Sequence, residues 1–161
     1  MEELKISATD NKQELYNCLT EQIKLLVGNE KNLIANMANV VAAIKQIFDF
    51  FWVGFYLRDT EEELVLAPFQ GPIACTRIKF GRGVCGTAWK LQQTVIVPDV
   101  TAFAGHIACS SESKSEIVVP VFHNNKVIAV LDIDSDRLNT FDETDKTHLQ
   151  KIVEIMMENY C

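Results

Sequence analysis

The feature that most constrains the fold is a pair of β-branched, apolar segments separated by a short turn. Residues 116–122 and 126–134 flank an Asn-containing turn at 123–125, a pattern that is typical of a β-hairpin. A second pair of strand-like segments, 50–57 and 63–67, flanks a charged turn. Two hairpins of this kind predict a mostly antiparallel sheet at the centre of the fold.

Apolar residues recur at helical spacing on either side of these hairpins. A first helix is expected to begin at a capping box of Asp10 and Gln13 and to stop at Gly28. A second helix is expected over about 33–48, and Asp142 is a suitable N-cap for a last one. The sequence therefore predicts an α+β fold with a five- to six-stranded sheet. Its N-terminal helices and C-terminal helix are expected on one face.

Length and charge narrow the class of protein. A chain of 161 residues fits a single domain, 1–161, that is large enough to bury a core. The net charge of −7 argues against nucleic acid or an anionic membrane as a partner. The chain has no apolar run long enough to span a bilayer, and its first residues lack a signal-peptide core. We therefore expect a cytoplasmic protein, in which thiols stay reduced.

Three of the five cysteines lie in loop-like stretches of the middle third. Cys75, Cys85 and Cys109 have glycine or proline close by, which lets distant segments turn tightly and meet. Cys109 also lies in a long loop, 98–114, and long loops in compact domains are usually functional. An odd number of cysteines does not suit a structural disulfide framework, so these thiols predict redox chemistry at a pocket.

The local surroundings of two cysteines predict reactive thiols. Cys85 lies near the start of an expected short helix at 84–91, where backbone amides favour a thiolate. Cys109 has His106 and Lys114 nearby in sequence, which would lower its pKa.

Aromatic and acidic residues alternate along the expected strands. Trp52 and Tyr56 share one strand face, and so do Asp132 and Asp134, while Glu116 directly precedes an apolar run. On pattern alone the aromatic pair favours a core face over a pocket. The acids likewise fit either a pocket or a solvated strand end.

Six short motifs follow one another along the chain. They are Phe51-Trp52-Val53-Gly54-Phe55-Tyr56, Gly71-Pro72-Ile73-Ala74-Cys75, Gly83-Val84-Cys85-Gly86, Gly105-His106-Ile107-Ala108-Cys109, Ser115-Glu116-Ile117-Val118-Val119-Pro120 and Leu131-Asp132-Ile133-Asp134-Ser135. Together they resemble the free methionine-(R)-sulfoxide reductases, which are stand-alone GAF domains. The resemblance covers roughly residues 30–156, and all three loop cysteines fall within it.

This resemblance implies a nucleophile at Cys109, with Cys85 and Cys75 as resolving thiols. It also implies free methionine (R)-sulfoxide as substrate, thioredoxin as reductant, no cofactor and, by analogy with other GAF domains, a homodimer. The substrate pocket is expected to be lined by Trp52, Tyr56, Glu116, Asp132 and Asp134. The chain departs from the family pattern at Thr101, Ala104 and Ala67.

Sulfoxide reduction needs an attacking thiolate, a resolving thiol and an acid near the oxygen. The chain offers Cys109 for the first, Cys85 or Cys75 for the second, and Glu116 or Asp134 for the third.

Two other functions compete with this one. A GAF domain without catalytic activity would bind a small ligand or sense peroxide, but it would need an output domain. A metal site made of the three cysteines and His106 lacks any usual zinc spacing, so no metal is expected.

Overall fold

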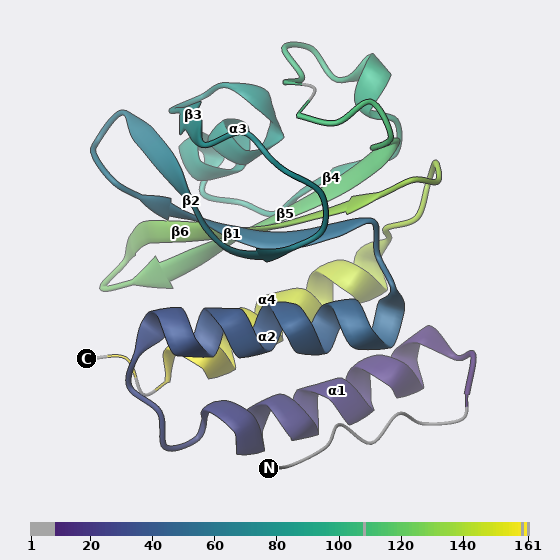
Figure 1. The fold of residues 1–161 in the computed structure, drawn as a ribbon, viewed down its shortest axis with the longest axis vertical. Coiled ribbons are helices and arrows are strands. Elements are labelled where there is room, and N and C mark those ends of the chain that lie inside the picture. The colour runs from purple at the N-terminus through teal and green to yellow at the C-terminus, as the bar shows by residue number, and fades with distance from the viewer. Residues whose placement is uncertain (1–8, 108, 159, 161) are drawn as a thin grey trace.

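The computed structural model describes residues 9–107, 109–158 and 160, whose strands form one antiparallel sheet (Figure 1). In chain order the elements are α1 (Lys12–Val27), α2 (Leu33–Phe48), β1 (Trp52–Arg58), β2 (Glu63–Gln70), β3 (Arg77–Lys79), α3 (Gly83–Leu91), β4 (Val95–Val97), the 3-10 turn η1 (Val100–Ala102), β5 (Ser115–His123), β6 (Lys126–Ser135) and α4 (Glu143–Met157). The strand order is β3-β2-β1-β6-β5-β4, and every neighbouring pair is antiparallel. Both predicted hairpins and the α+β class are confirmed.

The helices form two layers on one side of the sheet. Helices α2 and α4 cover the sheet directly, and α1 lies beyond them (Figure 1). The main core fills the space between these layers, with Tyr16, Ile44, Phe55, Ile133 and Leu149 almost wholly buried. The expectation that the N-terminal helices share one side is correct, but α1 packs against the other two helices instead of against the strands.

Helix α1 begins one residue later than the sequence suggests. Its N-cap is Asn11, whose side chain accepts a hydrogen bond from the Glu14 backbone N–H at 3.1 Å, so the expected capping box of Asp10 and Gln13 does not form. The last helix does start at Asp142, in a capping box with Asp145.

A buried polar cluster joins α1 to the start of α4. The Lys12 ammonium lies 2.6 Å from one carboxylate oxygen of Asp145, and the Tyr16 hydroxyl donates to the other at 2.8 Å. Because Asp145 is completely buried, these partners satisfy a carboxylate that water cannot reach. This cluster fixes α1 on the outer side of the helical layer.

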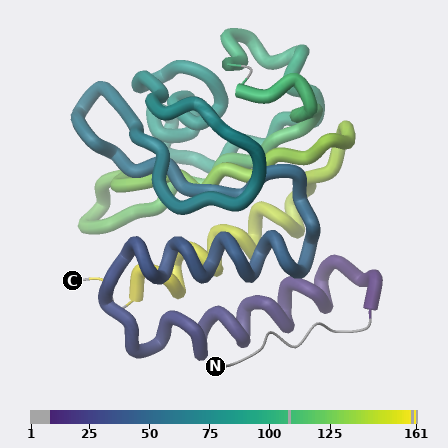
Figure 2. Tube along the Cα trace, viewed as in Figure 1, coloured from purple at the N-terminus to yellow at the C-terminus, as the bar shows by residue number. Residues whose placement is uncertain are grey.

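The opposite face of the sheet carries α3 and two loops, one after β2 and one after β4. Figure 2 follows the chain from the sheet into these segments, which lie on the side away from α1. The loop after β4 is closed at its base, since Val100 N–H donates to the Lys114 carbonyl at 3.0 Å. Asp99 caps η1 by accepting bonds from the backbone and the hydroxyl of Thr101. Thr101, one of the departures from the family pattern, therefore stabilises its own turn.

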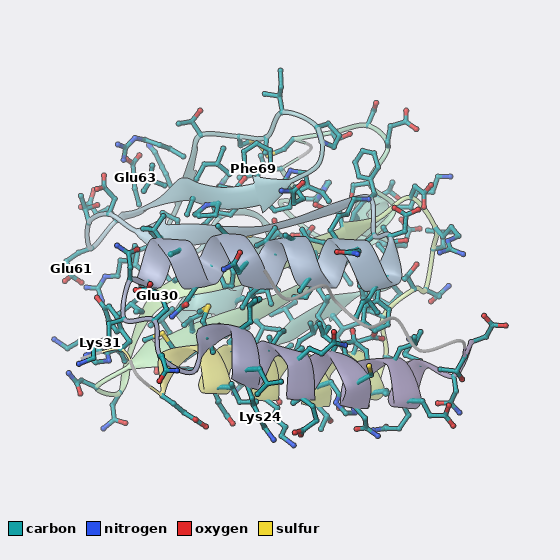
Figure 3. All side chains as sticks on the ribbon, turned by 60° about the horizontal axis from the view of Figure 1, so that its bottom comes forward. Lys24, Glu30, Lys31, Glu61, Glu63 and Phe69 are labelled. Atoms are coloured by element: carbon teal, nitrogen blue, oxygen red, sulfur yellow. A yellow bond between two sulfur atoms is a disulfide. The ribbon has the colours of Figure 1, made fainter. Side chains whose placement is uncertain are left out.

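Several charged side chains lie on the outer surface. Lys24 lies on the edge of α1 that faces away from α2, Glu61 lies at the β1–β2 turn, and Glu63 lies at the start of β2 (Figure 3). Within the described residues, no helix combines the length and the apolar character that crossing a membrane requires.

Candidate active site

The register of three central strands places the acids and Trp52 on the same face of the sheet. Trp52 pairs with Asp134 across β1 and β6, and Asp134 pairs with Glu116 across β6 and β5. Asp132 lies in the next row, opposite Gly54. Since directly opposite residues project to the same side, these side chains converge on the face away from α2 and α4. The two acids of β6 thus lie in a pocket and not at a solvated strand end.

A glycine makes room for the indole ring on this face. A Cβ atom at Gly54 would lie 2.3 Å from Cη2 of Trp52 and 2.5 Å from Cβ of Phe69. The indole ring also stacks on Tyr56 and Phe69, with centroid separations of 6.0 and 5.4 Å. The glycine in the first motif is therefore required by the packing of the tryptophan over the strand.

Both aromatic residues hold the segment that carries Cys75. Trp52 Nε1 donates a hydrogen bond to the Pro72 carbonyl at 3.1 Å, and the Tyr56 hydroxyl donates to the Cys75 carbonyl at 3.0 Å. Trp52 and Tyr56 are buried and also line the pocket, so the sequence alternatives of core and pocket are both realised.

Cys75 and Cys109 are joined by a disulfide whose α-carbons lie 5.4 Å apart. Cys75 follows β2 and is half-buried, whereas Cys109 lies in the exposed loop after β4. The sequence left Cys75 and Cys85 open as partners, and the structure pairs Cys75. An accessible disulfide at a pocket is open to attack by an external thiolate.

Cys85 remains a free thiol in the first turn of α3 and is 3% exposed. Burial and the neighbouring negative charges of Asp132 and Glu116 raise the pKa of this thiol well above its ordinary value. The predicted lowering of the pKa by the helix N-terminus is therefore wrong, because desolvation and two acids outweigh the backbone amides.

The three pocket acids all have raised pKa values. Burial is the main cause, and mutual repulsion adds to it for Glu116 and Asp132. Burial raises the pKa of Asp134 to about 6, although a short hydrogen bond from the Ser113 hydroxyl works in the opposite direction. Among the described residues that line the pocket there is no lysine or arginine. The site therefore favours a positively charged ligand.

The structure gathers every predicted site residue around this one cavity. Seven of the eight line it, and Cys75 adjoins it through the disulfide to Cys109. His106 and Ser113 also line it, and neither was assigned a place there from the sequence. The His106 Nε2 atom lies 3.9 Å from a Glu116 carboxyl oxygen, but burial lowers the pKa of His106 and raises that of Glu116. Both shifts disfavour an ion pair at this contact.

A GAF domain model matches residues 30–157. A Dictyostelium discoideum relative, GAF domain-containing protein A, is 61% identical over 155 residues, which cover 96% of this chain and 98% of that protein. The Escherichia coli free methionine-R-sulfoxide reductase is 44% identical over 144 residues, covering 89% and 87%. A free methionine-R-sulfoxide reductase from Neisseria meningitidis, solved in complex with its substrate, is 53% identical, with a TM-score of 0.96 and coverage of 99% and 96%. The chain belongs to the free methionine-R-sulfoxide reductases of the GAF family.

Membership of the free methionine-R-sulfoxide reductases confirms the family resemblance that the glycine- and cysteine-containing motifs indicate. Helix α1 lies outside the range matched by the GAF model, yet the Neisseria reductase covers 99% of the chain. The outer helix is therefore part of the architecture that this chain shares with that reductase.

Proposed function

We propose that this protein reduces free L-methionine (R)-sulfoxide to L-methionine through a cysteine sulfenic acid. The observation that carries the proposal is the Cys75–Cys109 disulfide beside a pocket lined by the buried acids Glu116 and Asp132 and the half-buried Asp134. The described lining residues include no lysine or arginine. The disulfide is the oxidised end of a catalytic cycle, and the acids account for a substrate that carries an ammonium group. A single domain, 1–161, carries the whole activity in this proposal.

The reductive step begins with both cysteines reduced. The Cys109 thiolate attacks the sulfoxide sulfur while a neutral carboxyl group, which we assign to Glu116, gives a proton to the oxygen. The oxygen moves to the Cys109 sulfur as a sulfenic acid, and methionine leaves as the sulfur–oxygen bond of the substrate and the transient bond between the two sulfurs break. Burial and two acidic neighbours raise the pKa of Glu116 well above its ordinary value, which suits it to this role.

The resolving step forms the disulfide. The Cys75 thiolate attacks the Cys109 sulfur, and the sulfenic oxygen leaves as water after protonation. We assign this role to Cys75 because it is bonded to Cys109, whereas Cys85 is free and its raised pKa disfavours the thiolate. An external dithiol then returns both cysteines to the reduced state with two electrons.

Recognition of a free amino acid follows from the charge of the pocket. Asp132 and Asp134 bind the substrate ammonium in this scheme, and Trp52 packs against the methyl end. A peptide bond replaces the ammonium with a neutral amide and leaves the buried acids without a partner, which is costly. The different groups at the two ends of the pocket then favour one configuration at sulfur.

The proposal also includes the reductant, the cellular compartment and the oligomeric state. Thioredoxin is the expected reductant, because Cys109 is exposed and its disulfide is reachable by a protein dithiol. The cytoplasm is a reducing compartment, in which the disulfide is returned to two thiols after each turnover. We also propose a homodimer, by analogy with GAF domains that pair through their terminal helices.

Methionine formation from each free sulfoxide diastereomer, with dithiothreitol as reductant, tests the proposed reaction. We expect turnover of the R form, little of the S form, and none with the Cys109→Ser variant. A protein that binds the R form without forming methionine would instead be a GAF sensor. Turnover that survives in Cys109→Ser would move the nucleophile to another cysteine.

A further inference from the structure

The free thiol of Cys85, which the reductase cycle does not use, lies beside two of the pocket acids. Its sulfur and one carboxylate oxygen each from Glu116 and Asp132 lie within 4.8 Å of one another. The three residues come from α3, β5 and β6, and all are at most 6% exposed. Three elements of the fold thus bring one sulfur and two oxygen donors together in the interior.

One of these donors has an unmet hydrogen-bonding requirement. Oδ1 of Asp132 is buried and accepts no hydrogen bond from any residue that the structure describes. A buried carboxylate oxygen without a partner is costly, so a ligand that supplies a positive charge or a donor is strongly favoured at this point. This oxygen is an observation independent of the clustering of the acids.

The charge around the cluster also calls for a cation. His106 is the one basic side chain among the described residues of the cavity wall, and its Nε2 atom lies 3.9 Å from a Glu116 carboxyl oxygen. Neither lysine nor arginine occurs among the described residues of the cavity wall. The substrate ammonium supplies a positive charge beside these acids only while substrate is bound.

The donor set selects among cations. Magnesium and calcium prefer oxygen ligands alone, whereas a thiolate combined with carboxylates suits zinc. Zinc binds sulfur at about 2.3 Å and carboxylate oxygen at about 2.0–2.2 Å, so donors of a tetrahedral site lie roughly 3–4 Å apart. The separations here require a contraction of only about 1 Å.

We propose that the substrate-free pocket binds one zinc ion through Cys85 Sγ and the carboxylates of Glu116 and Asp132. This inference rests on the proposed function only in placing both ligands in the same pocket. The protons of the thiol and of the carboxyl groups leave to solvent as the bonds to zinc form, and water completes the tetrahedral site. Because the ion occupies carboxylates that otherwise hold the substrate, zinc is a reversible competitive inhibitor. It also masks the one thiol of the pocket that stays outside the disulfide.

Calorimetric titration of the disulfide-intact protein with Zn²⁺ and with Mg²⁺ tests the site, since Cys75 and Cys109 cannot then act as ligands. We expect one zinc per chain and at least 100-fold weaker binding of Mg²⁺. Cys85→Ser and Asp132→Asn should each weaken zinc binding tenfold or more, and Cys18→Ser, the matched control, should leave it unchanged. Co²⁺ should give a thiolate charge-transfer band that Cys85→Ser abolishes.

The metal-binding experiments and the turnover assay test the zinc site and the reductase proposal independently of each other. No zinc binding, equal binding of Mg²⁺, or unchanged binding in folded Cys85→Ser overturns the metal site and leaves the reductase proposal standing. Circular dichroism of each variant identifies loss of folding, and the cobalt band of the unmodified protein reports the thiolate ligand without any substitution. Absence of the cobalt band would also overturn the site. Turnover is measured separately without zinc, so its failure would leave a measured metal site intact.

Discussion

Cys109 and Cys75 occupy different environments, and this difference separates their roles. Cys109 is exposed in the loop after β4, whereas Cys75 is half-buried and its carbonyl is bound by Tyr56. A nucleophile on an exposed loop is able to reach substrate and later a protein reductant. A resolving thiol on an anchored segment is held ready for it.

Single cysteine variants therefore have different expected kinetics. Cys75→Ser should lower thioredoxin-driven turnover at least tenfold but slow dithiothreitol-driven turnover much less, because a small dithiol attacks the sulfenic acid directly. Cys18→Ser is the matched control and should resemble the unmodified enzyme. Steady-state rates measured with thioredoxin and with dithiothreitol test this expectation. Equal losses with both reductants would contradict the role given to Cys75.

Asp134 links folding stability to pH. Its pKa is about 6 in the folded protein, above the ordinary value of about 4. The folded state then binds more protons than the unfolded state between these values. The stability from this group is complete below about pH 4 and is lost as pH rises through about 6.

Asp134→Asn should consequently stabilise the substrate-free protein at neutral pH by about 1–2 kcal/mol, with little gain in acid. Denaturant unfolding of the disulfide-intact protein at about pH 5 and about pH 8 measures the effect. The same variant should bind substrate more weakly, because the ammonium loses a carboxylate. A stability difference that does not change with pH would contradict the raised pKa of Asp134.

At the scale of elements, two buried tyrosines on opposite sides of the sheet make contrasting predictions. Tyr56→Phe removes the hydrogen bond to the Cys75 carbonyl, so formation of the disulfide after one turnover should slow by about three- to tenfold. Rapid quenching followed by thiol counting measures this rate. An unchanged rate would show that the bond to the loop does not position Cys75.

Tyr16→Phe should affect stability and spare catalysis. It leaves one oxygen of the completely buried Asp145 without its donor, which costs about 1–3 kcal/mol. Helix α1 lies on the far side of the sheet from the pocket (Figure 1), so kcat/KM should remain within about twofold. A large loss of kcat/KM at unchanged stability would contradict the separation of α1 from the site.

The elements themselves were largely predictable, and the site was predictable in part. Strand alternation places Asp132 and Asp134 on one face, and it does the same for Trp52 and Tyr56. The sequence cannot show that desolvation raises the pKa of Cys85, because burial depends on segments far away in the chain. The sequence does not place Ser113 in the site either. A serine in a polar loop is ordinary until the fold brings its hydroxyl to Asp134.

The packing partner of α1 was likewise not predictable from the sequence. Its apolar spacing predicts a helix but not the surface it packs against, and the choice of Asn11 over Asp10 as N-cap leaves Lys12 in the first turn, beside Asp145. Hydrophobic periodicity reports only on neighbouring residues of one helix. The layer in which α1 lies depends on the contact between Lys12 and Asp145, which are 133 residues apart.

For the whole molecule, the sheet separates a structural half from a reactive half. Helices α1, α2 and α4 lie on one side of the sheet, where the larger core is buried, and α3 and two loops lie on the other (Figures 1 and 2). The pocket acids, Trp52, Tyr56 and three cysteines gather on that second side. This division lets the pocket hold acids and a thiol with raised pKa values, since the larger hydrophobic core lies on the opposite side.

The most direct test of this account is a comparison of kcat/KM for free L-methionine (R)-sulfoxide and for its N-acetyl derivative. Acetylation replaces the ammonium that Asp132 and Asp134 are proposed to bind with a neutral amide, and it leaves the reacting sulfur unchanged. We predict a loss of about 1,000-fold or more for the acetylated substrate, because buried acids are left unpaired. Comparable kcat/KM values for the two substrates would contradict the claim that this pocket selects a free amino acid.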